Sequence, residues 1–107
     1  GKWTSPLKMN DFHVINPSNE ECCAIISLGG AADVNSAVKA AKEAFLNWSQ
    51  TSKEDKISLI QKLYEIYKSR WSEMAESISL EMGAPIDWAS SAQTSSGADH
   101  IKDFIKN

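Results

Sequence analysis

The sequence predicts a mostly α-helical segment that opens with a β-hairpin and continues with three or four helices. Three observations support this prediction. Two strand-like runs flank turn-forming residues at 17–20, apolar residues recur at helical spacing from residue 34 onward, and Gly83 and Pro85 stand where a long helical stretch has to end. The 107 residues suffice for one modest domain or for a piece of a larger one.

The N-terminal part divides into an arm and a hairpin. Residues 1–11 are polar and irregular, and we expect an arm there with a short strand around Trp3. Residues 12–28 are expected to form the hairpin, because Phe-His-Val-Ile-Asn precedes a turn at 17–20 and a second β-favouring run follows it. The turn residues, except Glu20, are good turn formers. A glycine pair at 29–30 ends the hairpin.

Residues 32–106 are expected to be helical, and the first helix is predicted from Ala32 to Trp48. Its apolar residues form one stripe, and polar and charged residues occupy the opposite face. Asp33 in the first turn suits the positive end of the helix dipole. The stripe consists of Val34, Ala37, Val38, Ala41, Phe45 and Trp48.

Two further helical stretches follow. Ser52 can cap the first, and Asp55 three residues later can answer it in a variant of the capping box. The apolar pattern shifts near Ser69, so we expect a bend or a new helix there. Gly83 stands where a helix end requires the left-handed conformation, and Pro85 prevents continuation. The expected buried faces are Ile57, Ile60, Leu63, Tyr64 and Tyr67, and then Trp71, Met74, Ala75, Ile78 and Met82.

The last helix is predicted to begin near Pro85 or Asp87. One continuous helical period assigns its stripe, which is less apolar than the others, and the run Ser95-Ser96-Gly97 lowers its helical propensity. The residues on this stripe are Ile86, Ala89, Ala92, Gln93, Ser96, Gly97, His100, Ile101 and Phe104.

Composition and charge exclude several classes of protein. The net charge is −3, and the 11 basic residues are interleaved with acidic ones, which disfavours binding to nucleic acid. No apolar run is long enough to cross a membrane, and no signal-peptide segment is visible. We therefore expect a soluble, cytoplasmic protein without a membrane or nucleic-acid partner.

Four runs of residues carry a family resemblance. In their order and spacing they are similar to the start of the NAD(P)-dependent aldehyde dehydrogenases, strongly from Phe12 to Pro85 and more weakly to Phe104. Glu20 departs from the glycine that is usual there, so we expect Asn19 to supply the positive φ, and Ala84 replaces a common lysine. The runs are Phe12-x-Val14-Ile15-Asn16-Pro17-Ser18, Ala24-x-Ile26, the helix from Ala32 to Trp48, and Leu80-Glu81-Met82-Gly83-x-Pro85.

The resemblance implies an α/β enzyme in which residues 1–107 are the N-terminal segment of a Rossmann-type NAD-binding domain. It implies oxidation of an aldehyde to a carboxylic acid with NAD or NADP, in a homo-oligomer. The nucleophilic cysteine, the general base, the oxyanion donor and the nicotinamide site lie downstream in the family pattern. We therefore expect no catalytic, cofactor-binding or metal-binding residue here, and a segment that alone is inactive and structural, with no bound cofactor.

Several residues resemble site residues but are better explained by structure. Cys22 and Cys23 are adjacent on a predicted strand, so a disulfide between them is disfavoured, and no cysteine–histidine cluster for zinc is present. His13 lies across the hairpin from them, without a third group to orient it. Glu81 stands near a helix end, and His100 has no partner in its pattern. The glycine pair at 29–30 lacks the rest of a phosphate-binding motif. The recurring aromatic residues Trp48, Tyr64, Tyr67 and Trp71 are expected to pack.

A polar strip on the last helix is the one candidate for substrate contact. By resemblance, helices in this part of the family border the substrate entrance of the intact enzyme. Gln93, Ser96 and His100 are therefore expected to help select the aldehyde.

Two alternatives from other classes remain. A free-standing helical interaction domain predicts helix stripes that satisfy one another, and an inactive truncated product predicts exposed apolar patches. The start at Gly1 without a methionine, and the end at Asn107 without a cap, favour a piece of a longer protein.

Overall fold

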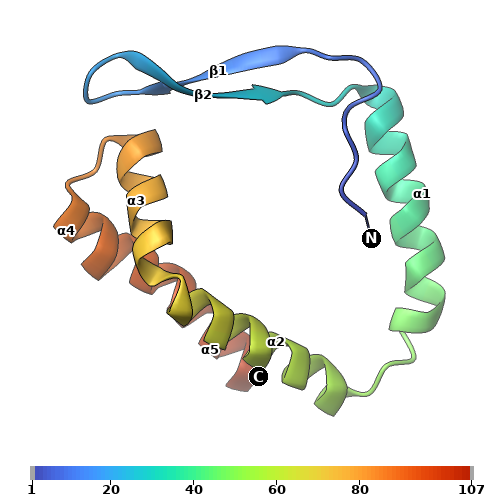
Figure 1. The fold of residues 1–107 in the computed structure, drawn as a ribbon. Coiled ribbons are helices and arrows are strands. Elements are labelled where there is room, and N and C mark those ends of the chain that lie inside the picture. The colour runs from blue at the N-terminus through green and yellow to red at the C-terminus, as the bar shows by residue number, and fades with distance from the viewer. Residues whose placement is uncertain (1, 107) are drawn as a thin grey trace. The chain divides into compact units, whose positions relative to one another are not determined.

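The computed structural model describes residues 2–106, so the expectations for Gly1 and Asn107 lie outside the described residues. The segment is mostly helical with a two-stranded N-terminal hairpin, as predicted (Figure 1). None of the described helices is long and apolar enough to traverse a bilayer. The elements are β1 (Asp11–Asn16), β2 (Glu21–Ser27), α1 (Ala31–Trp48), α2 (Lys53–Ser69), α3 (Trp71–Met82), α4 (Ile86–Trp88), the π-helical segment η1 (Ala89–Gln93) and α5 (Thr94–Lys106).

The chain divides into two compact units. The first contains the arm, the hairpin strands up to Val14 and from Cys22, and α1. The second contains the hairpin turn, Ile15–Glu21, and all helices after Ser52.

In the first unit, the carboxylate of Asp33 ties the arm to the start of α1. Asp33 Oδ1 accepts from the backbone N–H of Leu7 at 2.9 Å, and Oδ2 accepts from that of Gly30 at 2.8 Å. Gly30 is the N-cap of α1. Trp3 lies outside both strands, so the short strand expected around it is wrong. No backbone hydrogen bond to a neighbouring strand holds the arm at Trp3 in the described part of the chain.

The hairpin turn occupies residues 17–20, as predicted, but its positive φ falls on a different residue. Glu20, with a φ of 61°, adopts the left-handed conformation, and the expectation for Asn19 is wrong. The side chain of Asn19 instead bonds to Glu21, through the Glu21 N–H at 3.1 Å and the carboxylate at 3.1 Å. Glu20 therefore adopts a conformation that glycine takes without strain and that costs a residue with a side chain about 1–2 kcal/mol.

In the second unit, the turn packs against the end of α3. Gly83 has a φ of 68° and caps α3, as the sequence predicts. A Cβ atom at this position would lie 2.8 Å from Pro17 Cγ and 3.1 Å from Ser18 Oγ. Glycine is therefore required twice, for its backbone conformation and for the close approach of the hairpin turn.

The helices of the second unit share a small core. The helices α2 and α5 lie side by side, and α3 packs against η1 (Figure 1). Ser52 caps α2 by accepting from the Asp55 N–H at 3.0 Å, as predicted, and α2 ends at Ser69, where the bend was expected. Of the expected inner residues of α2 and α3, Leu63, Met74 and Met82 are exposed. The buried residues among those described are Ala75, Ala89, Thr94 and Ala98.

The predicted stripe of the last helix is partly wrong beyond residue 93, where Gly97 and Ile101 are half-buried as expected but the other three residues are not. The π-helical segment η1 holds more residues per turn than an α-helix, so every later residue moves around the axis. Thr94 and Ala98 are buried, whereas Ser96, His100 and Phe104 are exposed. The inner face therefore follows one position later than a continuous 3.6-residue period assigns.

Candidate functional site

The two cysteines are not arranged as a reactive pair. Cys22 is exposed, and its thiol donates to Ala24 O at 3.2 Å on the same strand. Cys23 is half-buried, and its thiol donates to Val14 O at 3.4 Å across the hairpin. Both thiols thus bond to backbone carbonyls, and neither bond goes to His13. This arrangement fits the structural interpretation of the cysteines.

The glycine pair at 29–30 lies beside a carboxylate of the chain itself. The carboxylate of Asp33 accepts from the N–H of Gly30, and the same carboxylate accepts from Leu7. These two hydrogen bonds, that of Leu7 first, lower the pKa of Asp33 below its ordinary value of 3.8. The carboxylate thus occupies the N-terminal end of α1, where helices commonly bind anions.

The polar strip expected on the last helix is only partly assembled. Ser96 and His100 are both exposed and four residues apart, so they lie on one face of α5. Gln93 belongs to η1 and is half-buried. Its side-chain oxygen is buried and has no hydrogen-bond partner among the described residues. The structure thus brings two of the three expected residues together.

Glu81 shows no arrangement of a catalytic acid. It is exposed in the last turn of α3, next to the Gly83 cap. No group of three or more His, Cys, Asp or Glu side chains able to hold a metal ion occurs within residues 2–106. The expectation that the segment has no catalytic, cofactor-binding or metal-binding residue stays a prediction.

A cluster of polar contacts around η1 was not predicted from the sequence. The indole N–H of Trp71 donates to Ser90 O and Ser90 Oγ, both at 3.2 Å. The hydroxyl of Tyr67 donates to Thr94 O at 2.9 Å, and Thr94 Oγ1 donates to Ala89 O at 2.9 Å. The helical spacing of Tyr67 and Trp71 indicated packing, and the two rings do meet edge to face at 6.1 Å. Their polar atoms, however, reach residues 19 to 27 positions away, which no local pattern indicates.

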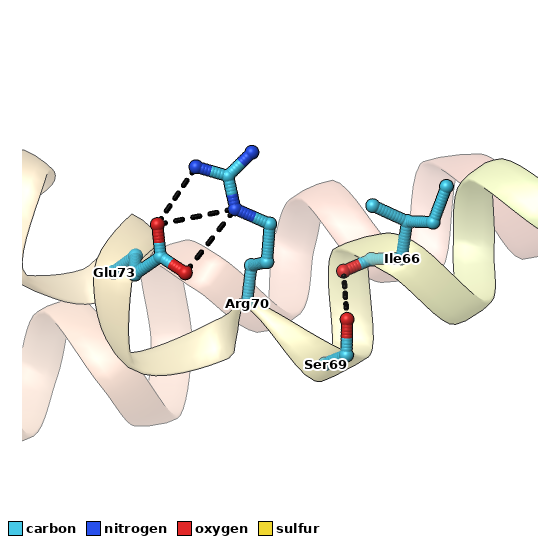
Figure 2. A network of polar contacts seen from close by, with 4 residues as sticks. All are labelled: Ile66, Ser69, Arg70 and Glu73. Carbon is cyan, nitrogen blue, oxygen red and sulfur yellow. Dashed lines mark hydrogen bonds and ion pairs between the residues drawn. The ribbon is translucent and has the colours of Figure 1, made fainter.

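A shallow hollow of about 280 Å³ lies along the junction of α2 and α3. At its edge, Arg70 binds the carboxylate of Glu73 through Nε at 3.1 Å and Nη2 at 2.7 Å (Figure 2). The hydrogen bonds between the two side chains, and then the attraction between their opposite charges, lower the pKa of Glu73 and raise the pKa of Arg70. Both side chains are more than half exposed, so the pair fixes local geometry and contributes little stability. The lining residues are Leu63, Ile66, Tyr67, Arg70, Glu73, Met74 and Ser77.

The chain matches one protein family over nearly its whole length. The profile described as the aldehyde dehydrogenase family matches residues 3–107. A curated relative, the 3-succinoylsemialdehyde-pyridine dehydrogenase of a Pseudomonas species, is 38% identical over 102 residues. That match covers 94% of this chain and 21% of the relative. The chain thus spans about a fifth of the length of this protein.

Solved structures show the same relationship. An aldehyde dehydrogenase from Bartonella henselae has a TM-score of 0.96 and 50% identity, over 98% of this chain and 22% of that protein. Aldehyde dehydrogenase C from Pseudomonas syringae has a TM-score of 0.92 and 42% identity, over 94% of this chain and 21% of that protein. The latter structure is of a variant in complex with NAD+ and octanal.

Proposed function

This chain belongs to the aldehyde dehydrogenase family, and we propose that it is the N-terminal part of an enzyme that oxidises an aldehyde to a carboxylic acid with NAD or NADP. The nucleophile, the general base and the nicotinamide site would come from the rest of the enzyme, because the chain spans about a fifth of its relatives. On its own the segment is then inactive, and its role is to support the catalytic parts.

One observation carries the structural role. The helix α1 has an apolar stripe, yet none of its residues is buried, and Val34 (58%), Val38 (48%) and Phe45 (63%) keep about half or more of their surface exposed. An amphipathic helix gains stability by burying such a stripe, and a large exposed apolar surface marks an interface. We infer that the stripe packs onto the remainder of the enzyme. A free-standing interaction domain would bury it within residues 2–106.

The cofactor is assigned to the rest of the enzyme for a physical reason. The helix start after the 29–30 glycine pair is occupied by the Asp33 carboxylate. We propose that NAD or NADP binds to a Rossmann-type domain on which this segment packs. The P. syringae relative, whose crystals contain NAD+, supports a nicotinamide cofactor for the intact enzyme.

We propose that Ser96 and His100 on α5 border the entrance for the aldehyde. The support is the family resemblance together with their shared, exposed face. His100→Ala in the intact enzyme should change the ratio of kcat/KM values across a panel of aldehydes by at least about threefold, which corresponds to ~0.7 kcal/mol. Unchanged ratios would remove this assignment.

The remaining properties follow from the same proposal. We infer that the intact enzyme is a soluble, cytoplasmic homo-oligomer whose small-molecule partner is an aldehyde. Sedimentation of the purified enzyme would test the oligomer, and a monomer would contradict it.

The decisive experiment is a chimera. Residues 3–107 replace the matching segment of the B. henselae enzyme, to which they are 50% identical. We expect the chimera to retain NAD(P)+-dependent aldehyde oxidation within about tenfold of the parent. The parent without the segment is the control and should be inactive. A folded, soluble chimera without activity would contradict the proposed function.

A second experiment tests the isolated chain. Its thermal melt and elution volume are compared with and without NAD+ and NADP+. A nucleotide that binds the folded state would raise the melting temperature by mass action. Since we place the cofactor site in the rest of the enzyme, neither nucleotide should shift the melting temperature of the isolated chain. A nucleotide-dependent shift would show a cofactor site within the segment and overturn the assignment above.

A further inference from the structure

The π-helical segment η1 is held by side chains from two other helices. Trp71, the first residue of α3, donates to the carbonyl of Ser90, and Tyr67 of α2 donates to the carbonyl of Thr94. The hydroxyl of Thr94, which is fully buried, donates a hydrogen bond to Ala89 O. A π turn is less favourable than an α turn, so it persists where other groups satisfy its backbone. These bonds supply that satisfaction.

Gly97 makes the contact with Tyr67 possible. A Cβ atom at position 97 would lie 2.5 Å from Tyr67 Oη and 3.1 Å from Cζ. Any residue with a side chain at this place would therefore push the ring away and break the bond to Thr94 O. The glycine that lowers the helical propensity of this stretch has a packing reason.

The alternative to the π segment is a continuous α-helix in a different register. Without the extra residue in η1, each position after 93 would rotate by about 100°. Ser96 would then replace Gly97 against Tyr67, and Phe104, now 73% exposed, would turn inward. One continuous helical period counted from Ile86 assigns this second register. This second register would place a side chain where Gly97 now meets Tyr67, so contacts from α2 and α3 favour the register that is observed.

We propose that Tyr67, Trp71 and Gly97 are positioning residues that select the π-containing register and so keep Ser96 and His100 on the outward face of α5. The Tyr67 hydroxyl leaves no room for a Cβ atom at position 97. The Trp71 indole N–H donates a hydrogen bond to the carbonyl of Ser90 in the π segment. The importance of this face for the aldehyde rests on the proposed function above. The selection of the register does not.

The register of α5 is tested by measuring the rates at which cysteine probes on this helix are labelled in the intact enzyme. Ser96→Cys and Asp99→Cys provide probes, and iodoacetamide labelling is followed on the corresponding peptides by mass spectrometry, so other cysteines do not interfere. Residue 99 stays exposed in either register and is the matched control. With Tyr67 and Trp71 present, both probes should label fast.

In the Tyr67→Phe, Trp71→Phe background, labelling at position 96 should slow at least tenfold while that at position 99 stays within twofold. The KM for aldehydes should then change more than kcat, with the KM for NAD(P)+ unchanged. Equal labelling of the position-96 probe in both backgrounds, or slow labelling with the native aromatics, would overturn the proposal. If the native enzyme oxidises no aldehyde, the proposed function fails, but the labelling still decides the register.

A double-mutant cycle provides an independent measurement if the double phenylalanine variant does not fold. Gly97→Ala is introduced with Tyr67 and with Tyr67→Ala. Loss of the ring should remove most of the loss of thermal stability that Gly97→Ala causes, because the Cβ no longer meets the hydroxyl. The same shift in Tm in both backgrounds would contradict the close fit of Gly97 to Tyr67.

Discussion

The helices α2 to α5 and the helix α1 differ in how their apolar residues are packed. All four buried residues of the described chain lie in α3, η1 and α5, and the largest fully buried side chain is that of Thr94. The helix α1 is one residue longer than α2 and more apolar, and neither helix has a buried residue. The helix α2, however, packs against α5 and donates a hydrogen bond to it through Tyr67. The first region is held by small residues and by hydrogen bonds between helices. The second is held at its start by Asp33.

The difference indicates where each region finds its packing partners. In α2–α5, small side chains allow close contact, and Tyr67 and Trp71 bond to distant carbonyls. The region therefore contains the groups that define its own geometry. In α1, local hydrogen bonds shape the helix, but its apolar stripe has no buried position among residues 2–106. We infer that α1 depends on the remainder of the enzyme and that α2–α5 depend on it less.

The largest expected effect comes from separating the hairpin turn from α3. Gly83→Ala introduces a side chain at a φ of 68° and places its Cβ 2.8 Å from Pro17 Cγ. The left-handed conformation alone costs on the order of 1–2 kcal/mol, and the clash adds to it. Chemical denaturation followed by circular dichroism should show a loss of roughly 2–3 kcal/mol.

The matched control is Gly30→Ala, because a Cβ there meets Asp33 Oδ2 at 3.8 Å, an ordinary contact. It should cost less than about 1 kcal/mol. Equal losses in the two variants would mean that the turn does not pack on α3 as described.

A smaller loss of folding stability is expected from a change at the start of α2. Ser52→Ala removes the oxygen that accepts from the Asp55 N–H at 3.0 Å. A lost N-cap typically costs about 1 kcal/mol, and the loss should appear in the denaturation midpoint. Ser52→Asp keeps an acceptor and should recover most of it. A failure of Ser52→Asp to recover stability would show that the serine acts otherwise than as a cap.

The Asp33 contacts should depend on pH. Because the folded-state pKa lies below 3.8, the bonds to Leu7 and Gly30 contribute at neutral pH and are lost as the pH falls from about that value through the lowered pKa. Acidification should speed hydrogen exchange of the Leu7 amide relative to that of exposed amides. Asp33→Asn should remove this extra pH dependence, and its persistence in the variant would exclude Asp33 as the cause.

The smallest effect is expected from the ion pair at the α2–α3 junction. Arg70→Gln removes the bonds to Glu73, but both partners are solvent-exposed (Figure 2). Screening by water makes such pairs weak, so the Tm should stay within measurement error. A clear drop in Tm would show that the junction, and not only the contacts around η1, stabilises α2–α5.

The sequence predicted features that depend on neighbouring residues. The hairpin turn, the Ser52 cap, the bend after Ser69 and the Gly83 stop were all confirmed. In each case the determining groups lie within a few positions of one another, so the local pattern contains the necessary information. The family resemblance likewise rests on such local runs.

Features that depend on distant contacts were missed. The register of α5 is determined by Tyr67 and Trp71, which lie in other helices. A continuous helical period therefore placed Ser96, His100 and Phe104 on the inner face, where they do not lie. Of the candidate site, the shared face of Ser96 and His100 followed from their four-residue spacing. The position of Gln93 did not, because it depends on the π segment.

The most direct test of the account is hydrogen–deuterium exchange of the isolated chain compared with the intact enzyme. If α1 depends on the rest of the enzyme, its amides should be protected at least about 100-fold less in the isolated chain, equivalent to ~2.7 kcal/mol. The amides of α2 and α5 should lose far less protection. Equal protection of α1 in both samples would show that the segment completes its own packing, and would contradict its assignment as a dependent part of a larger aldehyde dehydrogenase.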